Sequence, residues 1–304
     1  MTMRVTLTGA TGLIGTRLVR ALQERGDGVT VLSRSPERAR AALGDVDAHA
    51  WDPSAAPAPV DALEGRDAVV HLAGENVAQR WTDDAKRRIR ESRELGTRNL
   101  VAGLRAAQHR PPVLVSSSAV GYYGPHGPEP LPEDTPPGDD FLARVCVAWE
   151  REAQAAADLG LRVVLVRTGV VLDKDGGALG KMLPFFKAGI GGPVAGGRQH
   201  LPWVHADDVV GIYLRAVDDA RWSGPVNATA PRPVTNREFS KALGRALHRP
   251  ALAPVPALAI RTLYGEMAEI VTKGQNAIPR RALELGYRPS HPELDEALRS
   301  ALGG

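Results

Sequence analysis

The N-terminal segment "RVTLTGATGLIGTRLVRAL" constrains the fold more than any other part of the chain. It predicts a buried strand followed by a helix, because Val5 and Leu7 alternate and apolar residues then recur at helical spacing. Glycines stand at positions 9, 12 and 15, directly between strand and helix. There, one glycine can make a tight turn, one can let the backbone approach a pyrophosphate, and one can let the helix pack on the strand. The segment predicts dinucleotide binding, with an ordinary glycine turn as the alternative.

Strands and helices alternate along the rest of the N-terminal half. Short runs rich in Val and Leu, at residues 29–34, 67–74, 113–118 and 162–172, are separated by helical patterns, and a short third strand is expected at residues 47–52. Strands that are apolar almost throughout are typical of a parallel sheet with helices on both faces. We therefore expect an α/β fold, a Rossmann-like doubly wound parallel sheet with a smaller mixed C-terminal substrate domain.

The composition of the sequence changes after Leu172, where glycine-rich stretches replace the regular alternation of strands and helices. A further helical pattern follows at residues 205–222. We assign residues 1–170 to an NADP-binding Rossmann domain, to which 205–222 return. Residues 171–204 and 223–304 are expected to form the smaller C-terminal domain.

Composition excludes several classes of protein. The 304 residues carry a formal net charge of +3, and the basic stretch near residue 88 alternates with acidic and apolar residues. This pattern favours a solvated helix face over a nucleic-acid surface. The single cysteine, Cys146, allows no intramolecular disulfide and no thiolate zinc site, so we expect a reducing cytoplasm and no metal. No signal peptide and no transmembrane run are visible.

The end of the second expected strand indicates the type of cofactor. An NAD-binding protein usually carries an acidic residue there for the ribose 2′-hydroxyl. This chain has Ser33 and Arg34 instead. A guanidinium can bind a 2′-phosphate with two hydrogen bonds, whereas a carboxylate would repel it. The pair favours NADP over NAD, with a solvated loop arginine as the alternative.

Three motifs resemble those of the extended short-chain dehydrogenase/reductase superfamily, which includes UDP-sugar epimerases and dehydratases. They are "TGATGLIG", "HLAG" after the fourth strand and "SSSAVGYYG" after the fifth. Longer segments, among them "HLAGENVAQRW" and "GEMAEIVTKGQNAIPRRALELGY", resemble an atypical epimerase-family branch of that superfamily over nearly the whole chain. Members of the branch are also named nucleoside-diphosphate-sugar epimerases or SulA-like proteins. The branch keeps the cofactor site and lacks the usual active-site residues.

The glycine turn and the resemblance together imply a cofactor site along the carboxyl ends of the strands. Its parts would hold the pyrophosphate, the 2′-phosphate, the adenosine-ribose side and the nicotinamide end. The implied residues are Gly9, Thr11, Gly12, Leu13, Ile14, Gly15, Ser33, Arg34, Leu72, Ala73, Gly74, Arg93, Ser116 and Val171.

The superfamily's general acid/base is a Tyr in a Tyr-x-x-x-Lys motif, and this chain does not contain that motif. The residues four positions after its five tyrosines are His126, Gly127, Val217, Ala268 and His291. If Glu150 is used to align the helix, Leu142 stands at the Tyr position and Cys146 at the Lys position. Both read as core residues, so the standard dyad is absent.

Four residues remain as candidates for catalysis. By resemblance, Ser118 is the serine that polarises a substrate oxygen. Tyr122 and Tyr123 follow the same strand and could supply a phenol, or could line the pocket only. His205 lies in a segment that extended members place near the substrate, although a lone histidine is more often a structural hydrogen-bonding residue.

Several other polar residues could meet a substrate, each with a structural alternative. For Glu75 and Asn76 the alternative is loop capping, and for Lys181, Arg198 and Gln199 it is a solvated lid. Asp208 is expected to be the N-cap of the following helix.

These observations support an NADP(H)-dependent oxidoreductase or epimerase-like enzyme with an atypical active site. The alternative is a regulatory or sensor protein that binds NADP(H) without turnover. The expected partner is a small molecule, such as a nucleotide sugar or a carbonyl compound. We expect no nucleic-acid or membrane partner, a cytoplasmic location, and a monomer or homodimer.

Overall fold

The computed structural model describes residues 2–303, apart from the side chain of Leu263, and is built on a seven-stranded parallel sheet. The strand order is β10-β6-β5-β4-β1-β2-β3. The order reverses between β1 and β4, and in open α/β sheets ligands bind outside the carboxyl ends of the strands at such a point. The expected doubly wound sheet is therefore confirmed. Its strands are β1 (Arg4–Thr8), β2 (Gly28–Ser33), β3 (Asp47–Ala50), β4 (Ala68–His71), β5 (Val113–Ala119), β6 (Arg162–Thr168) and β10 (Gly224–Ala228).

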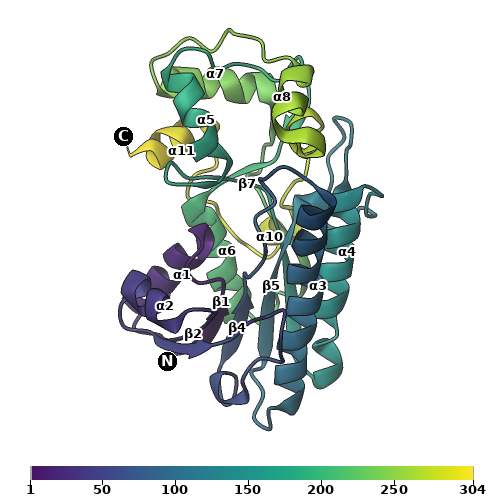
Figure 1. Cartoon of the computed structure of the whole chain (residues 1–304). Helices are drawn as coiled ribbons and strands as arrows, with labels where there is room; N and C mark the ends of the chain where they lie inside the picture. Colours follow the sequence, from purple (N-terminus) through teal and green to yellow (C-terminus); the bar gives the residue numbers. More distant parts are fainter. Residues whose placement is uncertain (1, 304) are drawn as a thin grey trace.

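Helices cover both faces of this sheet (Figure 1). One face carries α1 (Leu13–Glu24), α2 (Pro36–Leu43) and α6 (Ala206–Asp218), and the other carries α3 (Asp83–Ala106) and α4 (Phe141–Gln154). Successive side chains of each strand point to opposite faces of the sheet. Val113 and Val115 pack toward α1 and α6, whereas Leu114 packs toward α3. This two-sided burial explains why the strands are apolar almost throughout.

A smaller mixed layer lies beyond the carboxyl edge of the sheet, at the top of Figure 1. Its strands pair as β7 with β9, in parallel, and as β8 with β11, antiparallel. A separate apolar core joins its helices and contains Leu179, Phe186, Phe239 and Leu298. The elements are β7 (Val170–Leu172), α5 (Gly177–Lys187), β8 (His200–Leu201), β9 (Trp203–His205), β11 (Val234–Thr235), α7 (Asn236–Ala246), α8 (Ala257–Tyr264), α9 (Glu269–Thr272) and α11 (Leu294–Leu302).

Two details differ from the sequence-based expectation. The single strand expected at residues 162–172 is divided at Gly169 into β6 and β7, and a side chain at Gly169 would lie 2.1 Å from the Pro202 carbonyl oxygen. β10 lies within the region expected to belong to the smaller domain, yet it pairs with β6 at the edge of the large sheet. α10 (Arg280–Glu284) packs against β10. The remaining division of the chain into two domains stays a prediction.

A buried polar contact joins the central strands at the edge where ligands would bind. Nδ1 of His71 lies 2.7 Å from the Thr8 hydroxyl, and Nε2 lies 3.0 Å from the Thr97 hydroxyl of α3. The Thr8 oxygen also accepts hydrogen bonds from the amides of Leu72 and Ala73. His71 is fully buried, and burial lowers its pKa to about 4. Among residues 2–303, no helix has the length and hydropathy required to cross a membrane.

His71 should make the protein less stable in mild acid. The unfolded chain takes up a proton on this histidine near pH 6.5, whereas the folded protein does so only near pH 4. The free energy of unfolding should therefore fall as the pH drops between these values, by up to about 3 kcal/mol. In urea unfolding from pH 7 to pH 4.5, His71→Gln should lose less stability than the wild-type protein. Equal losses in the two proteins would contradict this role of His71.

Candidate cofactor and active site

The turn between β1 and α1 needs its first and third glycines for steric reasons. Gly9 has φ +67°, and a side chain there would lie 2.7 Å from the Leu72 carbonyl carbon at the end of β4. A side chain at Gly15 would lie 2.3 Å from the Gly9 carbonyl oxygen. α1 therefore packs directly on the turn, and the turn packs directly on β4.

The second glycine leaves the start of α1 open. A side chain at Gly12 would meet only the Gly9 carbonyl oxygen, at 3.3 Å, and Gly12 itself is exposed. No side chain caps α1, and its first turn holds no acidic residue. The amides of Leu13 and Ile14 are thus left to a ligand at the positive end of the helix dipole, where phosphates bind. The residues here fit a dinucleotide pyrophosphate.

The end of β2 carries the two residues expected to select the 2′-phosphate. The Ser33 hydroxyl accepts a hydrogen bond from the Ser35 amide and lies 3.2 Å from the Ser35 carbonyl oxygen. Arg34 is exposed, and within residues 2–303 its guanidinium makes no hydrogen bond or ion pair. A free guanidinium at this position fits a phosphate ligand.

Arg93 lies beside the end of β4. Its guanidinium carbon would be 3.1 Å from a side chain at Gly74, and it stacks on the Trp149 ring at 5.0 Å. Its hydrogen bonds go to the carbonyl oxygens of Glu75 and Ile89, and burial lowers its pKa. Because no described carboxylate forms an ion pair with it, Arg93 offers positive charge at the point where the strand order reverses.

The two residues expected at the nicotinamide end differ in accessibility. Ser116 is fully buried, and its hydroxyl donates to the Ser117 carbonyl oxygen, so its side chain has no surface for a ligand. Val171 is half-buried on β7. The segment after β7 returns to the start of α1, where a side chain at Gly176 would lie 3.0 Å from a Leu13 methyl carbon.

A buried ion pair forms hydrogen bonds with two of the candidate catalytic residues. The Ser118 hydroxyl donates to Oε1 of Glu150 at 2.6 Å. The same carboxylate receives two hydrogen bonds from Arg167, both at 2.8 Å. Arg167 also donates to the Tyr123 hydroxyl, which donates in turn to Oδ1 of Asn227. Ser118 and Tyr123 therefore belong to a polar network beneath the carboxyl edge of β5 and β6.

This network leaves Tyr122 as the accessible phenol. Tyr123 is fully buried, and burial raises its pKa to about 12, so it is a poor proton donor or acceptor at neutral pH. Tyr122 is half-buried, and its ring stacks on the Arg167 guanidinium at 3.4 Å.

Leu142 and Cys146, the residues expected at the family's Tyr and Lys positions, lie where α4 packs against the turn after β5. A side chain at Gly121 would lie 3.4 Å from the Leu142 β-carbon and 3.9 Å from the Cys146 sulfur, so α4 packs against this turn. Burial, and then the nearby Glu150, raises the pKa of Cys146 to about 12. The buried thiol agrees with the expectation that Cys146 is a core residue.

The structure corrects the expected role of Asp208. The N-cap of α6 is His205, whose Nδ1 accepts a hydrogen bond from the Asp207 amide. Asp208 is buried and accepts hydrogen bonds from the amides of Ser290 and His291. It was taken for a cap because it stands near the start of a helix, whereas its partners lie more than 80 residues away in the sequence.

Most of the remaining polar candidates form hydrogen bonds with backbone groups. Asn76 accepts a hydrogen bond from the Ala78 amide, in agreement with loop capping, and Lys181 donates to the Ala78 carbonyl oxygen. Gln199 donates to the carbonyl oxygens of Val194 and Val271. Glu75 accepts a hydrogen bond from the Gln79 amide group.

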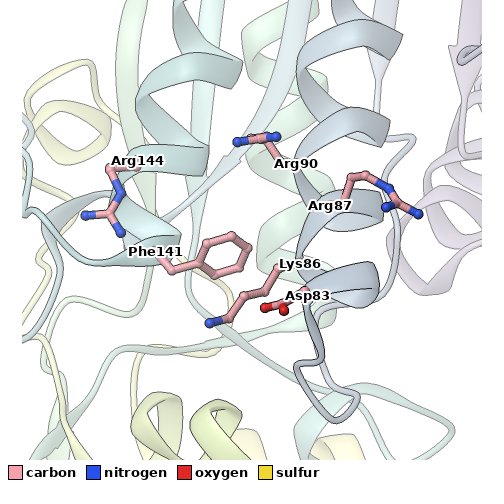
Figure 2. A pocket seen from close by; sticks show the side chains of 6 residues that line it. All are labelled: Asp83, Lys86, Arg87, Arg90, Phe141 and Arg144. Carbon is pink, nitrogen blue, oxygen red and sulfur yellow. The ribbon is translucent and has the colours of Figure 1, made fainter.

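A shallow groove of about 310 Å³ lies between α3 and α4 (Figure 2). Figure 2 shows the Phe141 ring between the two helices, with the positively charged side chains around it. The sequence did not single out this groove, because its cations alternate with acids along α3. Its lining residues are Asp83, Lys86, Arg87, Arg90, Phe141 and Arg144.

Comparison with known families agrees with this geometry. Residues 5–228 match the model of the NAD dependent epimerase/dehydratase family. The chain belongs to this family. Residues 255–301 match a second model, a domain of unknown function named DUF1731. The resemblance found in the sequence is therefore confirmed for both parts of the chain.

Relatives that match nearly the whole of this chain are found in plants and animals. This family member is 40% identical to "Epimerase family protein SDR39U1 homolog, chloroplastic" of Arabidopsis thaliana, over 99% of this chain and 87% of the relative. It is 38% identical to the human "Epimerase family protein SDR39U1", over 98% of this chain and 99% of the relative. A crystal structure of the human protein, isoform 2, with NADPH superposes with a TM-score of 0.88 at 37% identity, covering 99% of this chain and 100% of that chain.

Glu150 should contribute strongly to stability. Glu150→Gln leaves the buried Arg167 guanidinium without its counter-charge, which should lower the free energy of unfolding by about 3–5 kcal/mol. Glu152, two residues further along α4, pairs with the exposed Arg98 and provides the control. Glu152→Gln should cost less than about 1 kcal/mol. Denaturant unfolding measures both variants, and equal losses would contradict the structural role of the buried pair.

Proposed function

We propose that this chain binds NADP(H) and takes part in hydride transfer to or from a small carbonyl or hydroxyl substrate, as an oxidoreductase or epimerase-like enzyme. The observation that carries the proposal is the uncapped start of α1 behind Gly12, with the free guanidinium of Arg34 nearby at the end of β2. The NADPH in the related human structure supports the choice of cofactor.

Different residues of the chain would bind different parts of the cofactor. The amides at the start of α1 would hold the pyrophosphate, and Arg34 would hold the 2′-phosphate. Arg93 would add positive charge beside Gly74, near the sugar-phosphate part. When bound, the cofactor supplies or accepts the hydride.

The proton in such a reaction must come from the protein or from water, because reduction of a carbonyl adds a hydride at carbon and a proton at oxygen. The Ser118 hydroxyl donates its hydrogen bond to Glu150, and Tyr123 is buried. His205 is also buried, and its Nδ1 already accepts the Asp207 amide proton. Tyr122 is therefore the candidate that we favour for proton exchange with a substrate.

A second candidate function is an NADP(H)-dependent regulator or sensor without turnover. It is favoured by the polar network itself, because that network occupies Ser118 and Tyr123, and by Leu142 and Cys146 at the dyad positions. In either case we propose a small-molecule ligand at the carboxyl edge of the large sheet, action in the cytoplasm and a monomeric or homodimeric protein without a nucleic-acid or membrane partner.

The assignment of Arg34 predicts a change of cofactor preference. Arg34→Asp should weaken NADPH binding roughly tenfold to a hundredfold, because a charge-assisted hydrogen bond of about 1.5–3 kcal/mol is lost, and should leave NADH binding much less affected. Arg20→Asp on α1 makes the same charge change at another exposed arginine. Fluorescence titration with each nucleotide gives the ratio. An unchanged NADPH-to-NADH ratio in Arg34→Asp would remove the 2′-phosphate assignment.

An activity assay, together with substitution of Tyr122, distinguishes an enzyme from a sensor. If the protein is an enzyme, a panel of carbonyl compounds and nucleotide sugars should contain a substrate that changes the absorbance of NADPH. Tyr122→Phe should then lower kcat by roughly a hundredfold or more while NADPH affinity is kept. Tight NADPH binding without oxidation by any member of the panel would favour the sensor. Full activity of Tyr122→Phe would exclude this tyrosine as the proton donor.

A further inference from the structure

The segment that joins β7 to α5, residues 173–181, passes over the start of α1. A side chain at Gly176 would lie 3.0 Å from one methyl carbon of Leu13, and a side chain at Gly177 would lie 3.4 Å from the other. Gly177 also has φ +60°, a conformation that favours glycine. The two glycines therefore let the backbone of this segment lie directly on the first residue of α1.

An ion pair fixes the first end of the segment to α1. Nε of Arg17 lies 2.6 Å from a carboxylate oxygen of Asp173, whose side chain is only 1% exposed. The other carboxylate oxygen of Asp173 accepts a hydrogen bond from the Asp175 amide and so holds the turn that follows. Arg17 lies one helical turn after Leu13, so both residues lie on the same face of α1. The segment is thus bound to this face at two points.

A hydrogen bond fixes the second end of the segment to the loop after β4. The Lys181 ammonium group, in the first part of α5, donates to the Ala78 carbonyl oxygen at 2.6 Å. Ala78 lies between Gly74, which follows β4, and Thr82, the N-cap of α3. The segment therefore extends from the start of α1 to the loop after β4. A dinucleotide pyrophosphate would bind between these two elements, at the point where the strand order reverses.

We propose that residues 173–181 form a strap that closes over the pyrophosphate of the bound cofactor, and that the cofactor enters and leaves only when the contact between Lys181 and Ala78 opens. The inference rests on the proposed binding of NADP(H) at the start of α1. It adds that the strap controls the rates of cofactor exchange, whereas the glycine turn and Arg34 determine the affinity.

The Lys181 contact is the end of the strap that can open. It is a single, solvent-exposed hydrogen bond, whereas Asp173 at the other end is buried. Three side chains of α5 belong to the apolar core of the smaller layer, namely Leu179, Leu183 and Phe186. Opening therefore leaves α5 folded and separates the smaller layer from the loop after β4. Because the Lys181 contact joins two parts of the protein, it opposes opening in both directions of cofactor exchange.

The kinetics of cofactor exchange in Lys181→Met test the strap, because this change keeps the apolar stem of the side chain and removes the donor. Stopped-flow mixing with NADPH gives the association rate, and displacement of bound NADPH by excess NADP⁺ gives the dissociation rate, both from NADPH fluorescence. Both rates should rise by a similar factor, roughly threefold to tenfold, because a hydrogen bond that must break during opening is lost. The dissociation constant, which is the ratio of the two rates, should therefore stay nearly unchanged.

Lys187→Met is the matched control, because Lys187 ends the same helix, is exposed and makes no hydrogen bond or ion pair within residues 2–303. Its exchange rates should equal those of the wild-type protein, and circular dichroism shows whether both variants are folded. Unaltered rates in Lys181→Met would overturn the strap. Faster dissociation with unaltered association would also overturn it, because Lys181 would then bind the cofactor itself. A chain that binds no NADPH would overturn the proposed function together with the strap.

Cross-linking should have the opposite effect on release. Ala78→Cys and Lys181→Cys together place two thiols at the contact, and the single native cysteine, Cys146, is buried. A short bismaleimide linker applied with NADPH bound should slow NADPH release by roughly tenfold or more, because the strap can no longer open. Each single-cysteine variant, treated in the same way, should release NADPH at its untreated rate. Release from the cross-linked protein as fast as from the untreated double variant would overturn the strap.

Discussion

The buried pair of Glu150 and Arg167 determines what the carboxyl edge of this sheet can do. A carboxylate from α4 and a guanidinium from the end of β6 meet with both charges withdrawn from water. Such a pair is tolerated only when its other hydrogen-bonding capacity is satisfied. Ser118, Tyr123 and the Glu133 carbonyl oxygen satisfy it here. Ser118 and Tyr123, two of the residues expected to take part in catalysis, thus hydrogen-bond to a buried ion pair in this chain.

α4 packs against the turn that follows β5. Cys146 lies in the apolar contact between α4 and the turn after β5, where burial keeps its thiol protonated. The cofactor half of the site is built separately, from the turn before α1 and the ends of β2 and β4. The turn before α1 depends on its backbone geometry, whereas Arg93 beside the end of β4 also stacks on Trp149 of α4.

The sequence was most informative where the local backbone defines the structure. The spacing of Gly9, Gly12 and Gly15 predicted the turn, because glycines at this spacing directly after a strand are typical of a tight turn that leads into a helix. It was less informative where one position has several possible partners. The sequence predicted a helix cap at Asp208 and indicated no role for His71. Both are buried groups whose partners come from distant parts of the chain.

By itself, the sequence determined the parallel sheet, the nucleotide-binding turn, the family and the absence of the Tyr-x-x-x-Lys motif, since these follow from periodicity, short-range spacing and the residues present. Only the tertiary structure decided which polar side chains are open to a ligand. Ser118, Tyr122 and Tyr123 are neighbours in sequence, yet one faces Glu150, one stacks on Arg167 and one is fully buried. Their accessibility depends on residues of α4, β6 and β10, which come together only when the sheet is assembled.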